Sequence, residues 1–257
     1  EQARAGRPYA ERLRALIARV AAAAGDFDHP LLARREVKRT LLVVVTGDRG
    51  LAGPYNANLI RLAQQVLGEL QGRECLLLPV GRKGRDFFRR RGVAFLDEMT
   101  PIGETVTFAQ ARQLARRVTG AFASGEVDEV RLIYSQYLSA ISQRPRQEIL
   151  LPIGAVAGTT GDSAGTTAQR RHEYLLEPSP ERILEQLLPR YVETLIYRSL
   201  VEAKASEHGA RMTAMKNATD NAAELIETLT LDLNRARQAA ITKEIAEIVG
   251  GAEALSG

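Results

Sequence analysis

The C-terminal quarter of the chain constrains its fold more than any other segment. From Arg190 to residue 257 there is no proline, and most residues are strong helix formers such as alanine, leucine, glutamate, arginine and lysine. Pro189 fits the first turn of a helix that starts there. A helix from Tyr191 to about Ala254 would be ~95 Å long at ~1.5 Å per residue, wider than any single domain that this chain could form. The sequence therefore predicts a helix that leaves its own domain and packs against something else.

Apolar residues in this segment recur in steps of four and three, which is the spacing of a coiled-coil seam. One stripe consists of Ala222, Ile226, Leu229, Leu233, Ala236 and Ala240, and a second consists of Ile241, Ile245, Ile248, Ala252 and Leu255. The second stripe is out of phase with the first, as a stutter in the supercoil would allow. Because the stripes are narrow and rich in alanine, we expect one close helical neighbour rather than a broad core.

A second amphipathic segment opens the chain. Leu13, Leu16 or Ile17, and Val20 fall on one stripe at helical spacing. We interpret residues 1–25 as the end of an N-terminal coiled-coil helix, too short to pair with the whole C-terminal helix. The rest of the partner is expected either in another chain or in a segment preceding Glu1, and the absence of an initiator methionine favours the second.

Between the two helical segments, residues 26–180 alternate strand and helix signals. Helical periodicity covers residues 56–70, 84–91 and 107–123. Strands that alternate with helices form βαβ units, so we predict an α/β domain with a mainly parallel five-stranded sheet, followed by the long C-terminal helix over residues 181–257. Apolar, β-branched runs place the strands over residues 40–45, 75–80, 130–135, 147–152 and 173–176.

Composition disfavours several classes of protein. The chain has 35 Lys and Arg residues against 31 Asp and Glu, and the net charge of +4 is spread along it, which disfavours nucleic-acid binding. The single cysteine, Cys75, cannot form an internal disulfide. No run approaches the ~18 uninterrupted apolar residues of a membrane span, and no signal peptide opens the chain. Any membrane contact is therefore expected to pass through partners.

The loop after the first strand, residues 46–54, invites a nucleotide-binding interpretation. Its glycines, Gly47, Gly50 and Gly53, follow the pattern GxxGxxG, whereas a dinucleotide fingerprint needs GxGxxG and a P-loop needs GxxxxGK followed by Ser or Thr. A tight turn at a strand end explains these glycines. A nucleotide-binding enzyme with a helical oligomerisation arm remains the alternative, and it predicts that the isolated chain binds a nucleotide at this loop.

The sequence offers no other catalytic or metal site. His29, His172 and His208 are far apart, and none lies at metal-ligand spacing with Cys, Asp or Glu. The GxSxG nucleophile motif is missing, and no pair of carboxylates stands out. We therefore expect no catalytic residue, no cofactor and no metal ion, and an enzyme interpretation would rest on the α/β fold alone.

Two stretches of the sequence resemble one protein family. Residues 205–222 read ASEHGARMTAMKNATDNA, and the pattern continues with NRARQAAITKEI at 234–245 and IVGGA at 248–252. The loop after the first strand reads DRGLAGPYNAN at 48–58. Both stretches resemble the γ subunit of F-type ATP synthases, and because the order of elements between them also fits, the resemblance covers nearly the whole chain.

This resemblance implies a fold and a function. Family members have a Rossmann-like α/β domain that carries an antiparallel coiled coil of their N- and C-terminal helices. The coil enters the central cavity of a hexamer of α and β subunits, and the domain at its base joins the ε subunit and the membrane ring of c subunits. The implied function is that of a non-catalytic rotor shaft, which couples ion-driven rotation of the ring to ATP synthesis or hydrolysis in the hexamer. The implied location is peripheral, on the cytoplasmic face of the bacterial plasma membrane.

The resemblance also assigns contacts with the catalytic subunits to individual residues. Glu207 and Arg211, one helical turn apart, match a polar pair that faces the lower rim of those subunits. Arg237, Gln238 and Thr242 match the upper contact cluster, where the hexamer grips the shaft. An arginine suits such a rim because it can bridge carboxylates and backbone carbonyls.

At the other end of the shaft, Tyr174 and Glu177 fall where the foot of the family meets the ring. The N-terminal helix of the family precedes the position of Glu1, and the coiled coil is incomplete without it. Ala52 stands where many members have cysteine, and Cys75 alone excludes the redox control of the chloroplast type, which needs an inserted cysteine pair. We therefore expect a subunit of a bacterial enzyme rather than a mitochondrial one.

Overall fold

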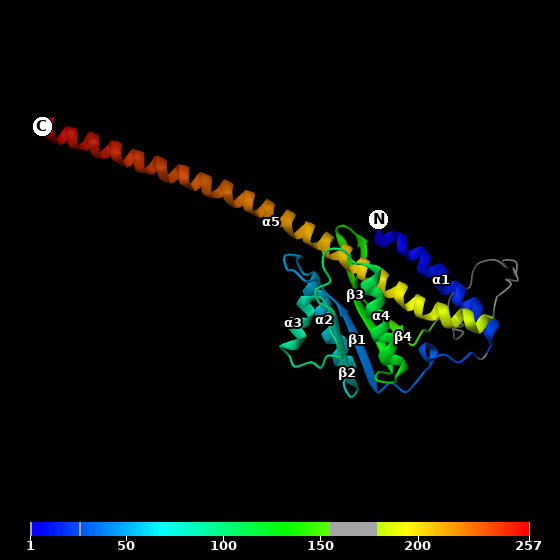
Figure 1. Cartoon of the computed structure of the whole chain (residues 1–257). Coiled ribbons are helices and arrows are strands. Elements are labelled where there is room, and N and C mark those ends of the chain that lie inside the picture. Colours follow the sequence, from blue (N-terminus) through cyan, green and yellow to red (C-terminus); the bar gives the residue numbers. More distant parts are fainter. Residues whose placement is uncertain (1, 26, 155–178, 257) are drawn as a thin grey trace. The chain divides into compact units, whose positions relative to one another are not determined.

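The computed structural model describes residues 2–25, 27–154 and 179–256, and it divides into two compact units, residues 1–211 and 212–257 (Figure 1). The described elements are, in chain order, α1 (Gln2–Ala24), the short 3-10 helix η1 (Pro30–Leu32), β1 (Arg39–Val45), α2 (Tyr55–Glu69), β2 (Glu74–Val80), α3 (Arg82–Arg89), α4 (Phe108–Ala123), β3 (Glu129–Ser139), β4 (Ser142–Leu151) and α5 (Pro180–Ser256). Every strand among the described residues belongs to the first unit, whereas the second unit consists of the final part of α5.

The four strands of the described chain form one mixed sheet in the order β2-β1-β3-β4. β1 pairs in parallel with both β2 and β3, so Val43 lies opposite Leu78 on one side and Leu132 on the other. β3 and β4 are antiparallel, because only two residues separate them and a crossover helix needs many more. The prediction of a mainly parallel sheet is confirmed, with β4 as its antiparallel edge. The fifth predicted strand, residues 173–176, lies outside the described residues.

β1 is buried on both faces, because helices cover both sides of the sheet (Figure 1). Leu41 and Val43 belong to the core shared with α1, α4 and α5, whereas Leu42 and Val44 belong to the core shared with α2 and α3. Successive side chains of a strand point to opposite faces, so this apolar run supplies both cores. The result is the helix-sheet-helix layering that a largely parallel sheet requires, and the predicted α/β class is confirmed.

The helices that flank the sheet begin and end within two residues of their predicted bounds. α4 begins with a capping box: Thr107 Oγ1 accepts from the Gln110 backbone N–H at 3.3 Å, and the Thr107 N–H donates to Gln110 Oε1 at 2.9 Å. These two bonds satisfy backbone donors that the first helical turn leaves open.

α1 and the first part of α5 pack against each other in the first unit, where they run side by side in opposite directions (Figure 1). Leu13, Ile17 and Val20 of α1 share a core with Leu184 and Leu188 of α5. The stripe predicted for the first segment is thus confirmed, with Ile17 as its buried member in place of the half-exposed Leu16.

The position of Pro189 differs from the sequence-based expectation. α5 begins at Pro180, so Pro189 lies inside the helix rather than in its first turn. A proline inside a helix removes one hydrogen bond and costs about 3 kcal/mol. Here Leu184 and Leu188, in the turn and a half before Pro189, are fully buried. Because packing contributes more to helix stability than propensity does, the helix continues through Pro189.

The second unit, taken by itself, is a single exposed helix. From Met215 to Ala252 every side chain is exposed, including the predicted apolar stripes; Ile248, for example, is 71% exposed. Such a surface is far more apolar than that of an isolated soluble helix. In the described part of the chain, no helix has both the length and the hydrophobicity needed to cross a membrane.

Candidate partner interface

The predicted contact residues fall into two groups along α5. Glu207 and Arg211 belong to the first unit, whereas Arg237, Gln238 and Thr242 belong to the second. The two predicted foot residues, Tyr174 and Glu177, lie outside the described residues.

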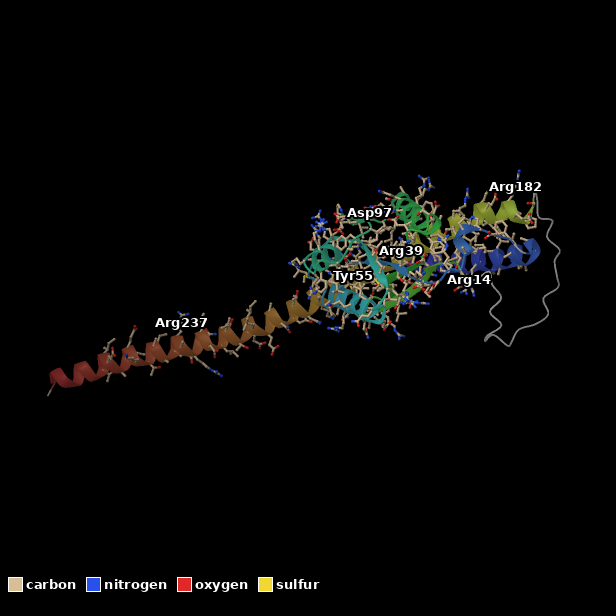
Figure 2. The ribbon with its side chains drawn as sticks, turned by 90° about the horizontal axis from the view of Figure 1, so that it is seen from below. Arg14, Arg39, Tyr55, Asp97, Arg182 and Arg237 are labelled. Carbon is tan, nitrogen blue, oxygen red and sulfur yellow. The ribbon has the colours of Figure 1, made fainter. Side chains whose placement is uncertain are left out.

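The upper group is exposed and available to a partner. Arg237 lies on the exposed part of α5 and has no ion-pair partner within the described part of the chain (Figure 2). Gln238 and Thr242 lie one turn apart, and Thr242 Oγ1 donates to the Gln238 carbonyl oxygen at 2.9 Å. This bond uses the backbone of Gln238, so Thr242 does not occupy the Gln238 side-chain amide. A free guanidinium beside a side-chain amide suits carboxylates and backbone carbonyls of a partner.

The lower group is built differently, because Glu207 is buried within its own chain. Its side chain is only 4% exposed, and its two carboxylate oxygens are both engaged. Oε1 accepts from Arg211 Nη2 at 2.6 Å, and Oε2 accepts from Lys204 Nζ at 3.1 Å. The Arg211 side chain is 24% exposed and also donates to the Gly50 carbonyl oxygen at 3.4 Å. Of these two residues, only Arg211 has enough exposed surface to contact a partner.

The glycine loop after β1, residues 46–54, packs against this part of α5. The Gly47 backbone lies against the Glu207 carboxylate, since a Cβ added there would be 2.9 Å from Oε1. The Tyr55 hydroxyl, at the start of α2, donates to the Ala203 carbonyl oxygen at 3.0 Å. Burial, and then the negative charge of Glu207, raises the pKa of Tyr55 above its ordinary value. The Glu207 side chain fills the space beside the first glycine that a nucleotide phosphate would need, which weakens the nucleotide-binding alternative.

The same loop is tied to two other loops by Asp48. Its carboxylate accepts three backbone N–H groups: Arg82 at 3.0 Å, Ile102 at 2.9 Å and Gly103 at 3.2 Å. Asn56 completes the arrangement by accepting from the Gly47 N–H at 2.9 Å. Asp48 and Asn56 therefore fix part of the loop backbone, whereas Leu51 is exposed at its tip.

Sequence reasoning identified Glu207 and Arg211 but missed their partners. Lys204, Glu207 and Arg211 stand three and four residues apart, which is the spacing of one helical face, and this signal could have predicted the ion pairs. The contacts with the loop carried no such signal, because Gly50 and Arg211 are 161 residues apart.

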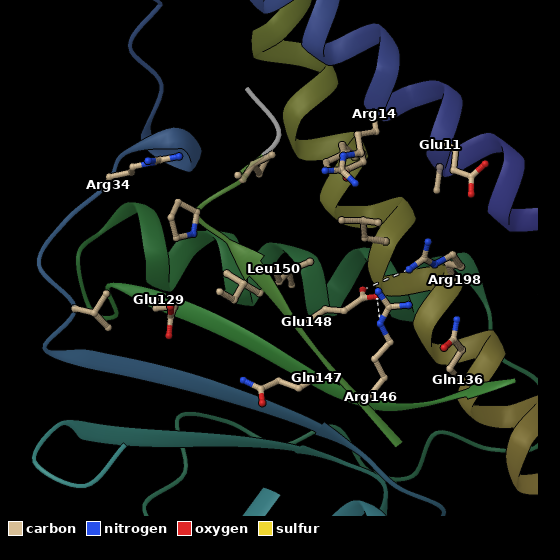
Figure 3. Close-up of a pocket in the computed structure, with 18 of the residues that line it drawn as sticks. Glu11, Arg14, Arg34, Glu129, Gln136, Arg146, Gln147, Glu148, Leu150 and Arg198 are labelled. Carbon is tan, nitrogen blue, oxygen red and sulfur yellow. Dashed lines mark hydrogen bonds and ion pairs between the residues drawn. The ribbon is translucent and has the colours of Figure 1, made fainter. Parts of the chain in front are cut away.

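A separate groove with a volume of about 970 Å³ lies between α1, β4 and α5 in the first unit (Figure 3). Its charged residues balance, with five arginines against five carboxylates, so the groove favours neither an anion nor a cation. They are Arg14, Arg34, Arg35, Arg146 and Arg198 against Glu11, Asp128, Glu129, Glu148 and Glu202. Among the described residues, no three metal-ligating side chains come together.

Glu148 anchors the polar contacts of this groove (Figure 3). It pairs with Arg146 at 2.9 Å and Arg198 at 3.4 Å, and it accepts from the Tyr134 hydroxyl at 3.1 Å. Burial, reinforced by the Glu148 charge, raises the pKa of Tyr134 to about 12. The Glu148 carboxylate is satisfied within the chain, whereas the buried Nε of Arg198 has no hydrogen-bond partner among the described residues.

Comparison with known proteins identifies the family of this chain. The family model described as ATP synthase matches residues 1–255. The chain is 52% identical over 250 residues to the ATP synthase gamma chain of Heliobacterium modesticaldum, covering 97% of this chain and 85% of that one. It is 54% identical over 256 residues to the ATP synthase gamma chain of Moorella thermoacetica, covering 99% and 86%. The chain belongs to the ATP synthase gamma chain family. It is a non-catalytic subunit, the central rotor stalk of an F-type ATP synthase.

A protein in a solved ATP synthase structure shares the fold. The chain matches a protein in the central stalk and c-ring structure of the Tetrahymena thermophila mitochondrial ATP synthase, with a TM-score of 0.56 and 24% identity, over 85% of this chain and 100% of that one. The gamma chains of Heliobacterium modesticaldum and Moorella thermoacetica come from bacteria, in agreement with the predicted bacterial origin.

Proposed function

We propose that this gamma chain couples ion-driven rotation of the membrane c ring to ATP synthesis or hydrolysis in the hexamer of α and β subunits. The observation that carries the proposal is the exposed second unit. From Met215 to Ala252 the helix exposes apolar stripes that a partner surface must cover. The central cavity of the hexamer, together with a second helix of the coiled coil, would provide such a surface.

A shaft of this kind can act without a catalytic site. Ile226, Leu229 and Leu233 lie on one side of the helix, whereas polar residues such as Asn234 and Gln238 lie on others. A rotating shaft therefore offers a different surface to each catalytic subunit in turn. A surface that binds one conformer better than another shifts the population toward it by the difference in affinity. We infer that the angle of the shaft selects the nucleotide affinity of each catalytic site.

The contacts follow from the exposed groups. We assign Arg237, Gln238 and Thr242 to the upper contact with the hexamer, and Glu207 and Arg211 to the region of the lower contact. The proposed partners of the foot are the ε subunit and the c ring, with Tyr174 and Glu177 at the ring. The proposed location is peripheral, on the cytoplasmic face of the bacterial plasma membrane. No cofactor and no nucleic acid is required.

The experiment is co-purification of the tagged full chain with α and β subunits, followed by an ATPase assay of the complex. We expect a stoichiometric complex whose activity falls at least ~10-fold in Arg237→Ala, because a charged contact at a desolvated rim is lost. The matched control is Arg235→Ala on the same helix, since Arg235 is exposed and pairs only with Asp232 at 3.6 Å among the described residues. Equal losses in the two variants would contradict the assignment of Arg237. A chain that purifies alone and binds a nucleotide would overturn the rotor function itself.

A further inference from the structure

The burial of Glu207 needs a reason, because a charged side chain is costly to bury. The ion pairs with Lys204 and Arg211 offset this cost, yet an exposed carboxylate could form the same pairs on the helix surface. α5 itself does not need the buried position, since pairs three and four residues apart form readily on exposed helices. The reason therefore lies in what the carboxylate faces, which is the glycine loop of residues 46–54.

Glu207 touches this loop directly at its first glycine. A Cβ added to Gly47 would lie 2.9 Å from Glu207 Oε1 and 3.0 Å from Cδ, closer than side chains normally approach. Gly47 has no positive φ, so the position is closed to larger residues by the Glu207 carboxylate and not by its backbone conformation. The loop and the carboxylate are thus in van der Waals contact.

Glu207 also reaches the loop through its two cationic partners. Arg211, bonded to Glu207 Oε1, donates to the Gly50 carbonyl oxygen at 3.4 Å. Lys204, bonded to Oε2, lies 3.9 Å from Glu104, which pairs in turn with Arg49 at 3.1 Å. One buried carboxylate therefore holds Arg211 where it contacts the loop, and holds Lys204 where it reaches Arg49 of the loop through Glu104.

The loop that Glu207 holds presents a strained, exposed side chain. Leu51 has a φ of +60° and is 75% exposed. A leucine in the left-handed region is unfavourable and persists where the surrounding structure fixes it. The contacts at Gly47 and Gly50 supply that constraint on the α5 side, whereas Asp48 supplies it on the side of the neighbouring loops.

We propose that Glu207 is a positioning residue, whose buried carboxylate holds the 46–54 loop against α5 and so fixes the exposed Leu51. Its contribution to the rotor is indirect, because it orders a surface of its own chain in the region of the proposed lower contact. The use of that surface in the assembly rests on the proposed function, but the positioning is a property of the chain alone.

Amide hydrogen exchange of the full chain, resolved by residue, tests this in Glu207→Gln. The Gly47 amide bonds to Asn56 Oδ1 within the loop, whereas the adjacent Thr46 amide bonds to the Val80 carbonyl oxygen at the edge of the sheet. We expect Gly47 exchange to rise at least ~10-fold while Thr46 exchange changes less than ~2-fold, as for a local opening. The control is Glu227→Gln, which alters an exposed carboxylate of α5 and should change neither amide. Unchanged Gly47 exchange, or an equal rise at both amides, would overturn the proposal.

A second variant tests the direct contact without removing the charge. Gly47→Ala places a methyl group against the Glu207 carboxylate and should raise loop exchange in the same way. In the double variant Gly47→Ala with Glu207→Ala, the effects should be less than additive on the logarithmic scale, because the carboxylate that clashes is gone. Additive effects would show that the two positions act independently and would contradict the proposal. Failure of the wild-type chain to assemble with α and β subunits would instead count against the proposed function and leave these exchange results in place.

Discussion

The two parts of α5 present the same kinds of residue in opposite settings. Up to Arg211, apolar side chains such as Leu188 and Val192 are buried in the core of the first unit, and Glu207 is paired within the chain. Beyond Met215, side chains such as Leu229 and Ile248 are exposed. Residue type therefore does not decide burial along this helix. The first part is stabilised by its own domain, whereas the second has an apolar surface whose partner is another helix or another subunit.

The largest expected difference is in the free energy of unfolding, between a variant of a buried leucine and a variant of an exposed one. Leu188→Ala should lower the free energy of unfolding by about 2–5 kcal/mol, because it leaves a cavity beside α1 in a fully buried site. Leu229→Ala should change it by less than about 0.5 kcal/mol in the isolated chain, because its side chain is exposed. Urea unfolding of the two variants makes the comparison. Similar losses would show that the second part of the helix is buried in the isolated chain.

A smaller effect, of opposite sign in the two parts, is expected at glycines. Gly209→Ala should destabilise by about 1–3 kcal/mol, because a Cβ there would lie 2.7 Å from the Ala140 carbonyl oxygen at the β3–β4 turn. Gly250→Ala meets nothing within 4 Å and should raise helix stability by about 0.5–1 kcal/mol. Thermal unfolding followed by circular dichroism measures both. A stabilising Gly209→Ala would mean that the turn does not pack on α5.

A further effect concerns alkaline pH, which should act on the first unit alone. Tyr55, Tyr134 and Tyr191 have raised pKa values and belong to that unit, whereas residues 212–257 contain no tyrosine. A raised pKa contributes stability that is complete below the unfolded value near 10 and is lost as the pH rises through the folded value, about 12 for Tyr134.

We therefore expect stability to fall between pH 10 and 12, with Tyr134 contributing about 1–2 kcal/mol of the loss. Urea unfolding at several pH values should show a shallower fall in Tyr134→Phe than in the wild-type chain. Identical pH profiles would exclude Tyr134 as a source of the dependence.

Local signals predicted most of the fold. The β-branched run at residues 40–45 became β1, and the periodic segments became α2, α3 and α4, because each carries its own pattern. The continuation of α5 through Pro189 was not predictable in this way. Pro189 is a local breaker, and the packing of Leu184 and Leu188 on α1 that overrides it joins residues far apart in the sequence.

The same limit applies to the interface. Arg237 and Gln238 are exposed, as expected for polar residues on the surface of a helix. Their contact with the hexamer stays a prediction. Glu207 fits a surface position equally well, and no local pattern indicates its burial. Its environment is set by Gly47 and Gly50, whose approach depends on the completed fold.

The position of α5 at the end of the sheet has a mechanical consequence. In doubly wound folds with this strand order, the carboxyl ends of the two central strands open a crevice where exchangeable ligands bind. Here the helix lies across that place, with the Ser206 hydroxyl donating to the Ser135 carbonyl oxygen of β3 and Glu207 against Gly47 after β1. A ligand can dissociate, but a helix continuous with the domain cannot. A twisting force on this part of α5 is therefore transmitted to the sheet through the contacts of Ser206 and Glu207, which do not depend on a bound ligand.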